Sequence, residues 1–99
     1  MFVSSFKIIA KDGFEAETIR AARNMSALLK LHCGSEGSIL YRGLDGGLFA
    51  YAKWPSLEIW KQRERDIAVL NEARADMDRF VLETLPLFSS SEVIFSNAG

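Results

Sequence analysis

The chain has 99 residues, enough for one domain, and residues 1–99 are expected to form a single domain. A net charge of −1 argues against a nucleic-acid-binding surface, and no apolar run reaches the length of a membrane span, so neither partner is expected. The single cysteine excludes an internal disulfide and a cysteine metal cluster, and it fits a reduced, cytoplasmic setting.

The first half of the chain predicts a strand, a helix and a hairpin. Residues 2–11 mix β-branched and aromatic side chains and are followed by Asp12-Gly13, which predicts a strand and its end. Residues 14–34 predict a helix, because their apolar side chains recur at steps of three and four. Residues 37–43 and 48–54 predict two strands joined by a turn at Asp45-Gly46-Gly47.

The second half predicts two helices and a last strand. Pro55 is expected to end the third strand, with Ser56 close to the start of a short helix. A longer helix is expected from about residue 66 to residue 85, where Pro86 would end it, and residues 90–96 are expected to form the fourth strand. The order β-α-β-β-α-α-β predicts an α+β, ferredoxin-like βαββααβ sandwich with a four-stranded antiparallel sheet.

The third predicted strand carries apolar groups on both faces. Alternation places Ala50, Ala52 and Trp54 on one face, and Phe49 and Tyr51 on the other. The helices can cover only one face of such a sheet, yet 48% of the residues are hydrophobic. A second copy packed against the uncovered face would bury it, so we expect a homodimer.

The order of elements, Asp12-Gly13, and the segment EGSILYRGLDGGLFAYAKWPSLEIWKQR at residues 36–63 resemble the antibiotic biosynthesis monooxygenase-like family. The resemblance covers nearly the whole chain and implies a dimeric α/β barrel. For one branch it implies a cofactor-independent monooxygenase that forms quinones from a small aromatic or polyketide-like substrate. The substrate loses a proton and its carbanion reacts directly with dioxygen, so neither a metal nor another cofactor is expected.

Trp54 matches the Trp that ends the third strand in this family, and it is the first candidate site residue. The small side chains of Ala50 and Ala52 leave room beside it for a small apolar or aromatic molecule. The expected substrate-binding residues are Trp54, Tyr41, Trp60, Ala50, Ala52, Phe80 and Met77. Trp54 is also a candidate catalytic residue through its indole N–H, although the same position suits a core tryptophan.

His32 is the second candidate catalytic residue, because its ordinary pKa lies near neutrality. It also lies at the end of the predicted first helix, where a cation stabilises the helix dipole. Arg42 could stabilise an oxyanion, but a charged strand residue in solvent is an equally open interpretation. Tyr51 could donate to an oxyanion, or it could pack within the dimer.

Two other functions remain open. The same pocket would suit a non-catalytic binding protein or dimerisation module for a hydrophobic metabolite. A haem-binding or haem-degrading protein is the third alternative. That branch of the family resembles this chain at Trp54, but it uses an Asn on the first strand and a haem-ligating His on the helix after the Trp. Here the first strand offers Ser4 and Ser5, and no histidine follows Trp54.

Overall fold

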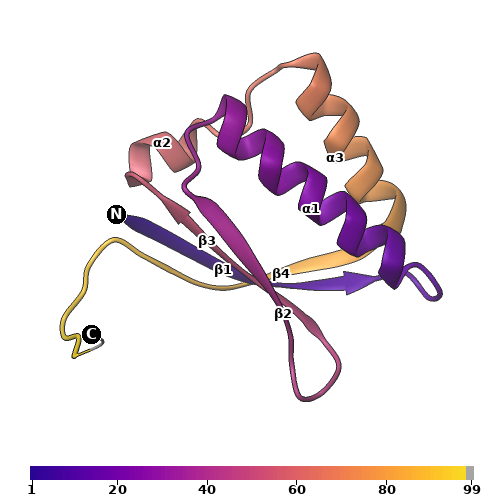
Figure 1. The fold of residues 1–99 in the computed structure, drawn as a ribbon, viewed down its shortest axis with the longest axis horizontal. Coiled ribbons are helices and arrows are strands. Elements are labelled where there is room, and N and C mark those ends of the chain that lie inside the picture. Colours follow the sequence, from indigo (N-terminus) through magenta and orange to yellow (C-terminus); the bar gives the residue numbers. More distant parts are fainter. Residues whose placement is uncertain (98–99) are drawn as a thin grey trace.

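The computed structural model describes residues 1–97, which form a four-stranded antiparallel sheet with three helices packed on one side of it (Figure 1). The strand order is β2-β3-β1-β4. The elements are β1 Phe2–Ala10, α1 Glu15–His32, β2 Gly37–Arg42, β3 Leu48–Trp54, α2 Leu57–Lys61, α3 Ala68–Phe80 and β4 Val81–Ser90. The predicted order of elements and the ferredoxin-like α+β class are therefore confirmed.

The β2–β3 hairpin forms where the sequence predicts it. The backbone N–H of Gly43 donates to the carbonyl of Gly47 at 2.7 Å, and the Asp45 carboxylate accepts from the N–H of Gly47 at 2.8 Å. Gly46 has φ +87°, a conformation that favours glycine. This turn aligns Arg42 with Leu48 and so sets the register of the whole hairpin.

The short helix also begins as predicted. The Ser56 hydroxyl caps α2 by accepting a hydrogen bond from the N–H of Ile59 at 3.2 Å. At the other helix boundary, Gly34 follows α1 with φ +78°, which suits the residue after a helix end. Local turn and capping chemistry therefore explains both boundaries.

The end of α3 and the position of β4 were predicted wrongly. The helix ends at Phe80 rather than residue 85, and β4 starts at Val81 with no intervening loop. Pro86 lies inside β4, opposite Phe6 and next to a register shift. An edge strand tolerates a proline because it does not need every N–H for pairing, and β4 pairs only with β1. Residues 91–97 contain no strand, although one was predicted at 90–96.

Two clusters of buried side chains form the core under the helices. One contains Phe2, Cys33, Trp54 and Leu70, at the end of the sheet where β1 begins and β3 ends. The other contains Ile8, Leu48 and Ala50, near the opposite end of the same two strands.

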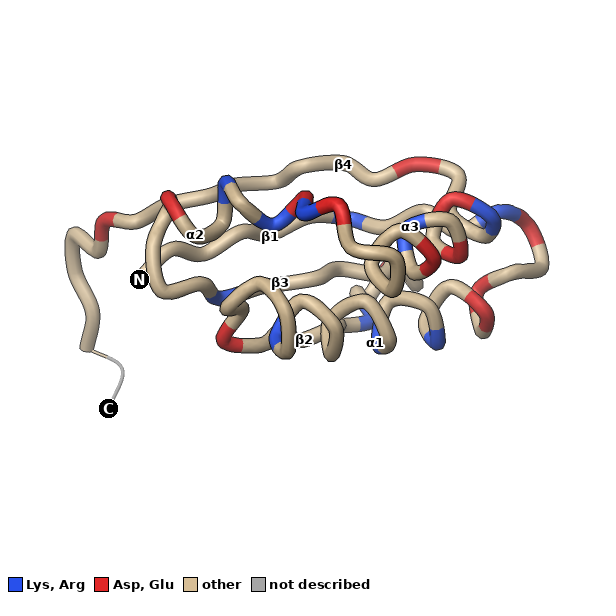
Figure 2. The backbone as a smooth tube through the Cα atoms, turned by 90° about the horizontal axis from the view of Figure 1, so that it is seen from above, with Lys and Arg blue, Asp and Glu red and all other residues tan. Residues whose placement is uncertain are grey.

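The sheet face away from the helices, the open face, is uncovered and largely apolar. Strand pairing aligns Val3, Ser5, Lys7 and Ile9 of β1 with Phe49, Tyr51 and Lys53 of β3, Ile39 and Tyr41 of β2, and Glu83, Leu85 and Phe88 of β4. Glu83 is the only charged residue of β4, and Figure 2 shows β4 as an almost uncharged tube along one edge. Hydrophobic side chains therefore face solvent on this side of the sheet.

Candidate functional site

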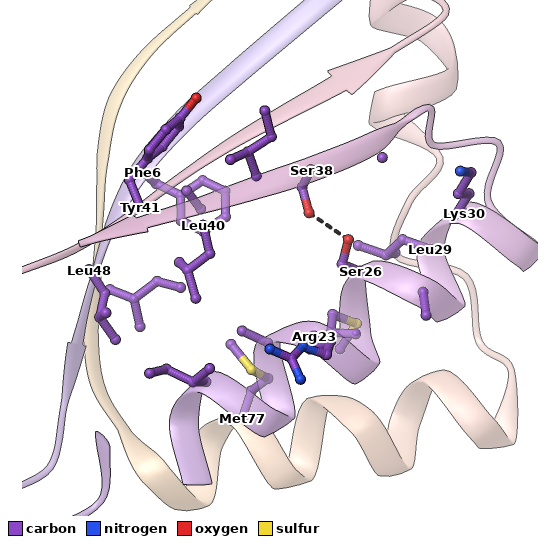
Figure 3. Close-up of a pocket in the computed structure, with 18 of the residues that line it drawn as sticks. Phe6, Arg23, Ser26, Leu29, Lys30, Ser38, Leu40, Tyr41, Leu48 and Met77 are labelled. Carbon is purple, nitrogen blue, oxygen red and sulfur yellow. Dashed lines mark hydrogen bonds between the residues drawn. The ribbon is translucent and has the colours of Figure 1, made fainter. Parts of the chain in front are cut away.

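A cavity of about 710 Å³ lies between α1 and the sheet (Figure 3). Its floor is apolar and buried, formed by Ile8, Leu48 and Ala50 from two neighbouring strands. Ile19 and Leu29 of α1 and Leu40 of β2 add partly buried apolar walls. The volume falls in the range of about 300–1,000 Å³ that is typical of small-molecule sites.

The cavity opens between the exposed side of α1 and the edge strand β2. We call this opening the mouth, and its exposed lining residues on α1 and on the helix-covered face of β2 are Arg23, Ala27, Lys30, Ser38 and Arg42. β2 pairs only with β3, so nothing within residues 1–97 lies beyond it in the sheet. A ligand could therefore enter past β2 and place an apolar group on the buried floor.

Two serine hydroxyls meet across the mouth. The Oγ atoms of Ser26 on α1 and Ser38 on β2 are 2.5 Å apart and share a hydrogen bond (Figure 3). Each hydroxyl has one hydrogen to donate, so their mutual bond uses one and leaves the other free. The pair therefore links the helix to the edge strand and still offers one O–H donor to a ligand.

The charged side chains that line the cavity are all cationic: Arg23, Lys30 and Arg42. Arg42 pairs with Glu15 at the start of α1, where Nη2 and Oε1 lie 2.5 Å apart. The hydrogen bond from Arg42 lowers the pKa of the Glu15 carboxyl, and the same bond raises the pKa of Arg42. The side chains of Arg23 and Lys30 have no ion-pair or hydrogen-bond partner among residues 1–97.

Three of the seven predicted substrate-binding residues line this cavity: Tyr41, Ala50 and Met77. Ala50 forms part of the floor, as its small size suggested. Tyr41 pairs with Phe49 on the open face, and Figure 3 shows its ring on the side of β2 away from α1. The phenol of Tyr41 therefore points away from the cavity. Tyr41 lines the cavity mainly because it lies on β2, between Leu40 and Arg42.

The other predicted residues lie outside the cavity. Trp54 is 2% exposed and packs with Phe2, Cys33 and Leu70, while Ala52 packs against the same cluster. The cavity therefore lies beside Ala50 but not beside Ala52. The indole of Trp54 belongs to the neighbouring core cluster.

Trp60, Phe80 and His32 are also absent from the cavity lining. The ring centroid of Trp60 lies 4.8 Å from that of Phe2, and the Arg63 guanidinium lies 3.8 Å from the Trp60 ring centroid. Phe80 packs near Phe14, with ring centroids 5.7 Å apart. His32 is the last residue of α1.

Of the polar residues at the mouth, only Arg42 was a candidate from the sequence, and Arg23, Ser26, Lys30 and Ser38 were missed. Ser38 shares a face with Leu40 and Arg42 through alternation, and the hairpin register aligns these residues with Ala52, Ala50 and Leu48. Extending the alternation from β3 to β2 would have placed Ser38 on the helix-covered face. On α1, Arg23, Ser26 and Lys30 are three and four residues apart, so they form a polar stripe beside the apolar one.

Within residues 1–97, no group of three or more His, Cys, Asp or Glu side chains is arranged to hold a metal ion. None of the helices in the described part of the chain has the length and hydropathy needed to cross a membrane.

No family model and no curated protein matches this chain, but solved structures do. A Deinococcus radiodurans protein, provisionally named an antibiotic biosynthesis monooxygenase, matches with a TM-score of 0.76 and 12% identity over 100% of this chain and 99% of its own. A Bordetella bronchiseptica protein with the same provisional name matches with a TM-score of 0.72 and 18% identity, over 94% and 98%. At3g17210 from Arabidopsis thaliana matches with a TM-score of 0.75 and 12% identity, over 97% and 99%. The chain therefore has the fold of the antibiotic biosynthesis monooxygenase-like proteins.

Proposed function

We propose that this protein binds a small apolar or aromatic molecule in the cavity between α1 and β2 and oxidises it with dioxygen without a bound cofactor. The observation that carries the proposal is the cavity itself: a buried apolar floor beneath a mouth with a hydroxyl pair and cations. Such a site can hold a flat ring and orient it through a few polar contacts. The oxidation is what the resemblance to the quinone-forming monooxygenases implies.

The proposed oxidation requires that the protein stabilise the deprotonated form of the substrate. An anthrone-type ring loses a proton from carbon, and the carbanion adds dioxygen to form a peroxide. Loss of water then leaves a quinone carbonyl, so one substrate and one O₂ yield one quinone and one H₂O. A free hydroxyl of the Ser26–Ser38 pair could donate to the developing oxyanion, and the nearby cations would stabilise its charge.

The alternative is a non-catalytic binding protein that holds a hydrophobic metabolite in the same cavity. One observation favours it: no Asp, Glu or His side chain is among the described residues that line the space. A carboxylate or imidazole acting as general base would therefore have to come from outside this lining. Catalytic roles for Trp54 and His32 stay predictions, since both lie outside the cavity lining.

We propose in addition that two copies pair through their open faces as a dimeric α/β barrel. Ile39, Phe49, Tyr51, Leu85 and Phe88 lie on this face, outside the cover of the helices. Packing of two such sheets would remove these side chains from water, which is the main favourable contribution to association. The cavity lies on the other face and stays accessible in this arrangement.

Oxygen uptake with an anthrone-type substrate tests the proposal when a variant with a blocked cavity is measured beside the wild type. Ala22 on α1 is partly buried and lines the cavity, so Ala22→Phe fills it with a ring. Ala75→Phe on the exposed side of α3 is the matched control. We expect substrate-dependent uptake in the wild type and the control, and loss in folded Ala22→Phe. Binding without uptake in the wild type would favour the binding-protein alternative.

A further inference from the structure

We propose that the ligand of the α1–β2 cavity is an aromatic anion, with its ring on the apolar floor and its negative charge at the mouth. This inference names the substrate class of the proposed function and rests on the ligand-binding part of it. Three observations carry it: the common sign of the lining charges, the lack of partners for two of them, and the hydroxyl pair between those two.

The charged residues that line the cavity are all cationic, whereas the chain as a whole has a net charge of −1. The chain has 12 Lys and Arg residues against 13 Asp and Glu residues, so its charges are nearly balanced overall. The cavity lining contains Arg23, Lys30 and Arg42 and no acidic residue. A cavity lined by one sign, with low-dielectric walls, concentrates ligands of the opposite charge.

The two cations on α1 are available to a ligand. Arg42 already pairs with Glu15, whereas Arg23 and Lys30 have no ion-pair or hydrogen-bond partner within residues 1–97. Their seven-residue spacing places them about 10 Å apart along the helix axis, with Ser26 between them. An anion that contacts Ser26 would therefore lie within about one Debye length of both cations at physiological salt.

The hydroxyl pair supplies a directional hydrogen bond beside the two exposed cations. With the Ser26 and Ser38 oxygens 2.5 Å apart, one hydroxyl donates to the other and the second hydrogen is free. A hydroxyl that already accepts a hydrogen bond is polarised and becomes a better donor. A carboxylate or phenolate oxygen at the mouth could accept this hydrogen, while the attached ring extends toward Ala50 and Leu48.

Paired titrations with 2-naphthoate and naphthalene-2-carboxamide isolate the charge, because the two molecules share a ring system and have similar shapes. Affinities are measured by calorimetry at low salt for the wild type, Arg23→Gln, Lys30→Gln and the double variant. Lys61→Gln on α2 is the control, since Lys61 is exposed and outside the cavity. We expect the wild type to bind naphthoate roughly three- to tenfold tighter than the amide, which is the range for two partly exposed charge contacts.

The variants decide which residues produce the preference. We expect the double variant to lose most of it while amide affinity stays within about twofold, and Lys61→Gln to keep it. Equal binding of both molecules by the wild type would overturn the anionic assignment and leave the cavity as a ligand site. An undiminished preference in the double variant would also overturn it. Binding of neither molecule at millimolar concentration would count against the cavity and hence against the proposed function as well.

Discussion

The hydroxyl oxygens of Ser26 and Ser38 lie 2.5 Å apart and form a side-chain hydrogen bond between α1 and the edge strand β2. Twelve positions separate the two serines in the sequence. The hydrogen bond crosses the mouth of a cavity whose floor is otherwise apolar. The serine pair therefore links α1 to β2 and also leaves one hydroxyl hydrogen free to donate to a ligand.

Removal of the serine hydroxyls should give a non-additive pattern in naphthoate binding. In Ser26→Ala or Ser38→Ala the remaining hydroxyl still has one hydrogen to donate, so affinity should change by no more than about threefold. The double variant has no donor and should bind roughly tenfold more weakly or worse, as expected for a lost hydrogen bond to a charged group. Calorimetry on all four proteins measures the coupling. Single variants that each lose as much as the double would show that the intact pair, rather than one free hydroxyl, contacts the ligand.

The Glu15–Arg42 pair should be visible in the pH dependence of stability. The pKa of Glu15 is lowered in the folded protein, so the pair stabilises the fold above the ordinary carboxyl pKa of 4.5. That contribution is lost as pH falls through the lowered folded-state pKa. Glu15→Gln should therefore show a flatter stability profile in this acid range by denaturant unfolding. In Arg42→Gln, NMR titration should find the Glu15 pKa nearer its ordinary value, and an unchanged value would contradict the assigned cause.

Glu15→Gln should also strengthen anion binding near neutral pH. The substitution removes the carboxylate that pairs with Arg42, and Arg42 lines the cavity. A third unpaired cation would then be available at the mouth. A modest gain in naphthoate affinity with no gain for the carboxamide is expected by calorimetry. Weaker naphthoate binding in a folded variant would indicate that the pair positions Arg42 for the ligand.

Trp54 should prove important for stability rather than for the cavity. It is 2% exposed and packs with Phe2, Cys33 and Leu70, so Trp54→Ala should lower the free energy of unfolding by about 3–5 kcal/mol. Trp54→Phe should cost less and remain folded, with naphthoate affinity close to the wild type. Denaturant unfolding and calorimetry on this variant separate the two roles. A folded Trp54→Phe protein that no longer binds would support the original prediction that the indole forms part of the site.

A charge placed on the open face should prevent two copies of the chain from pairing. Tyr51 lies on this face, flanked through strand pairing by Ile39 and Ser5. Tyr51→Glu would bring a charge into the proposed sheet-to-sheet interface, so this variant should run as a monomer where the wild type is expected to run as a dimer in size-exclusion chromatography with light scattering. Ala75→Glu on the exposed side of α3 is the control and should leave the dimer intact. A wild-type monomer at micromolar concentration would contradict the proposed dimeric barrel.

The parts of the fold that local chemistry determines were predicted well from the sequence. The β2–β3 hairpin depends on Asp45 and glycines within its own turn, and α2 depends on the Ser56 cap. The start of β4 was predicted wrongly because Val81, Leu82 and Leu85 fit both a helix and a strand. Pairing with β1, some 80 positions earlier, selects the strand, and no local pattern reveals that contact.

The difference between local chemistry and long-range contacts also explains which parts of the site could be predicted. The small size of Ala50 indicated space on the helix-covered face, and Ala50 does form part of the floor. Neither the Ser26–Ser38 contact nor the grouping of Arg23 with Arg42 was predicted, because each depends on where α1 crosses the edge strand. That crossing is a property of tertiary packing, so a single sequence read along its length does not reveal it.

Chemical-shift mapping with 2-naphthoate locates the bound ligand in the protein. Backbone amide and indole N–H signals are followed during titration of the full chain. We predict that the largest shifts fall on Ser26, Lys30, Ser38 and Leu40, at the mouth and wall of the cavity, while the indole signals of Trp54 and Trp60 move little. Shifts centred on the two indoles, with the α1–β2 signals unmoved, would contradict binding in the cavity and place the site in the neighbouring cluster.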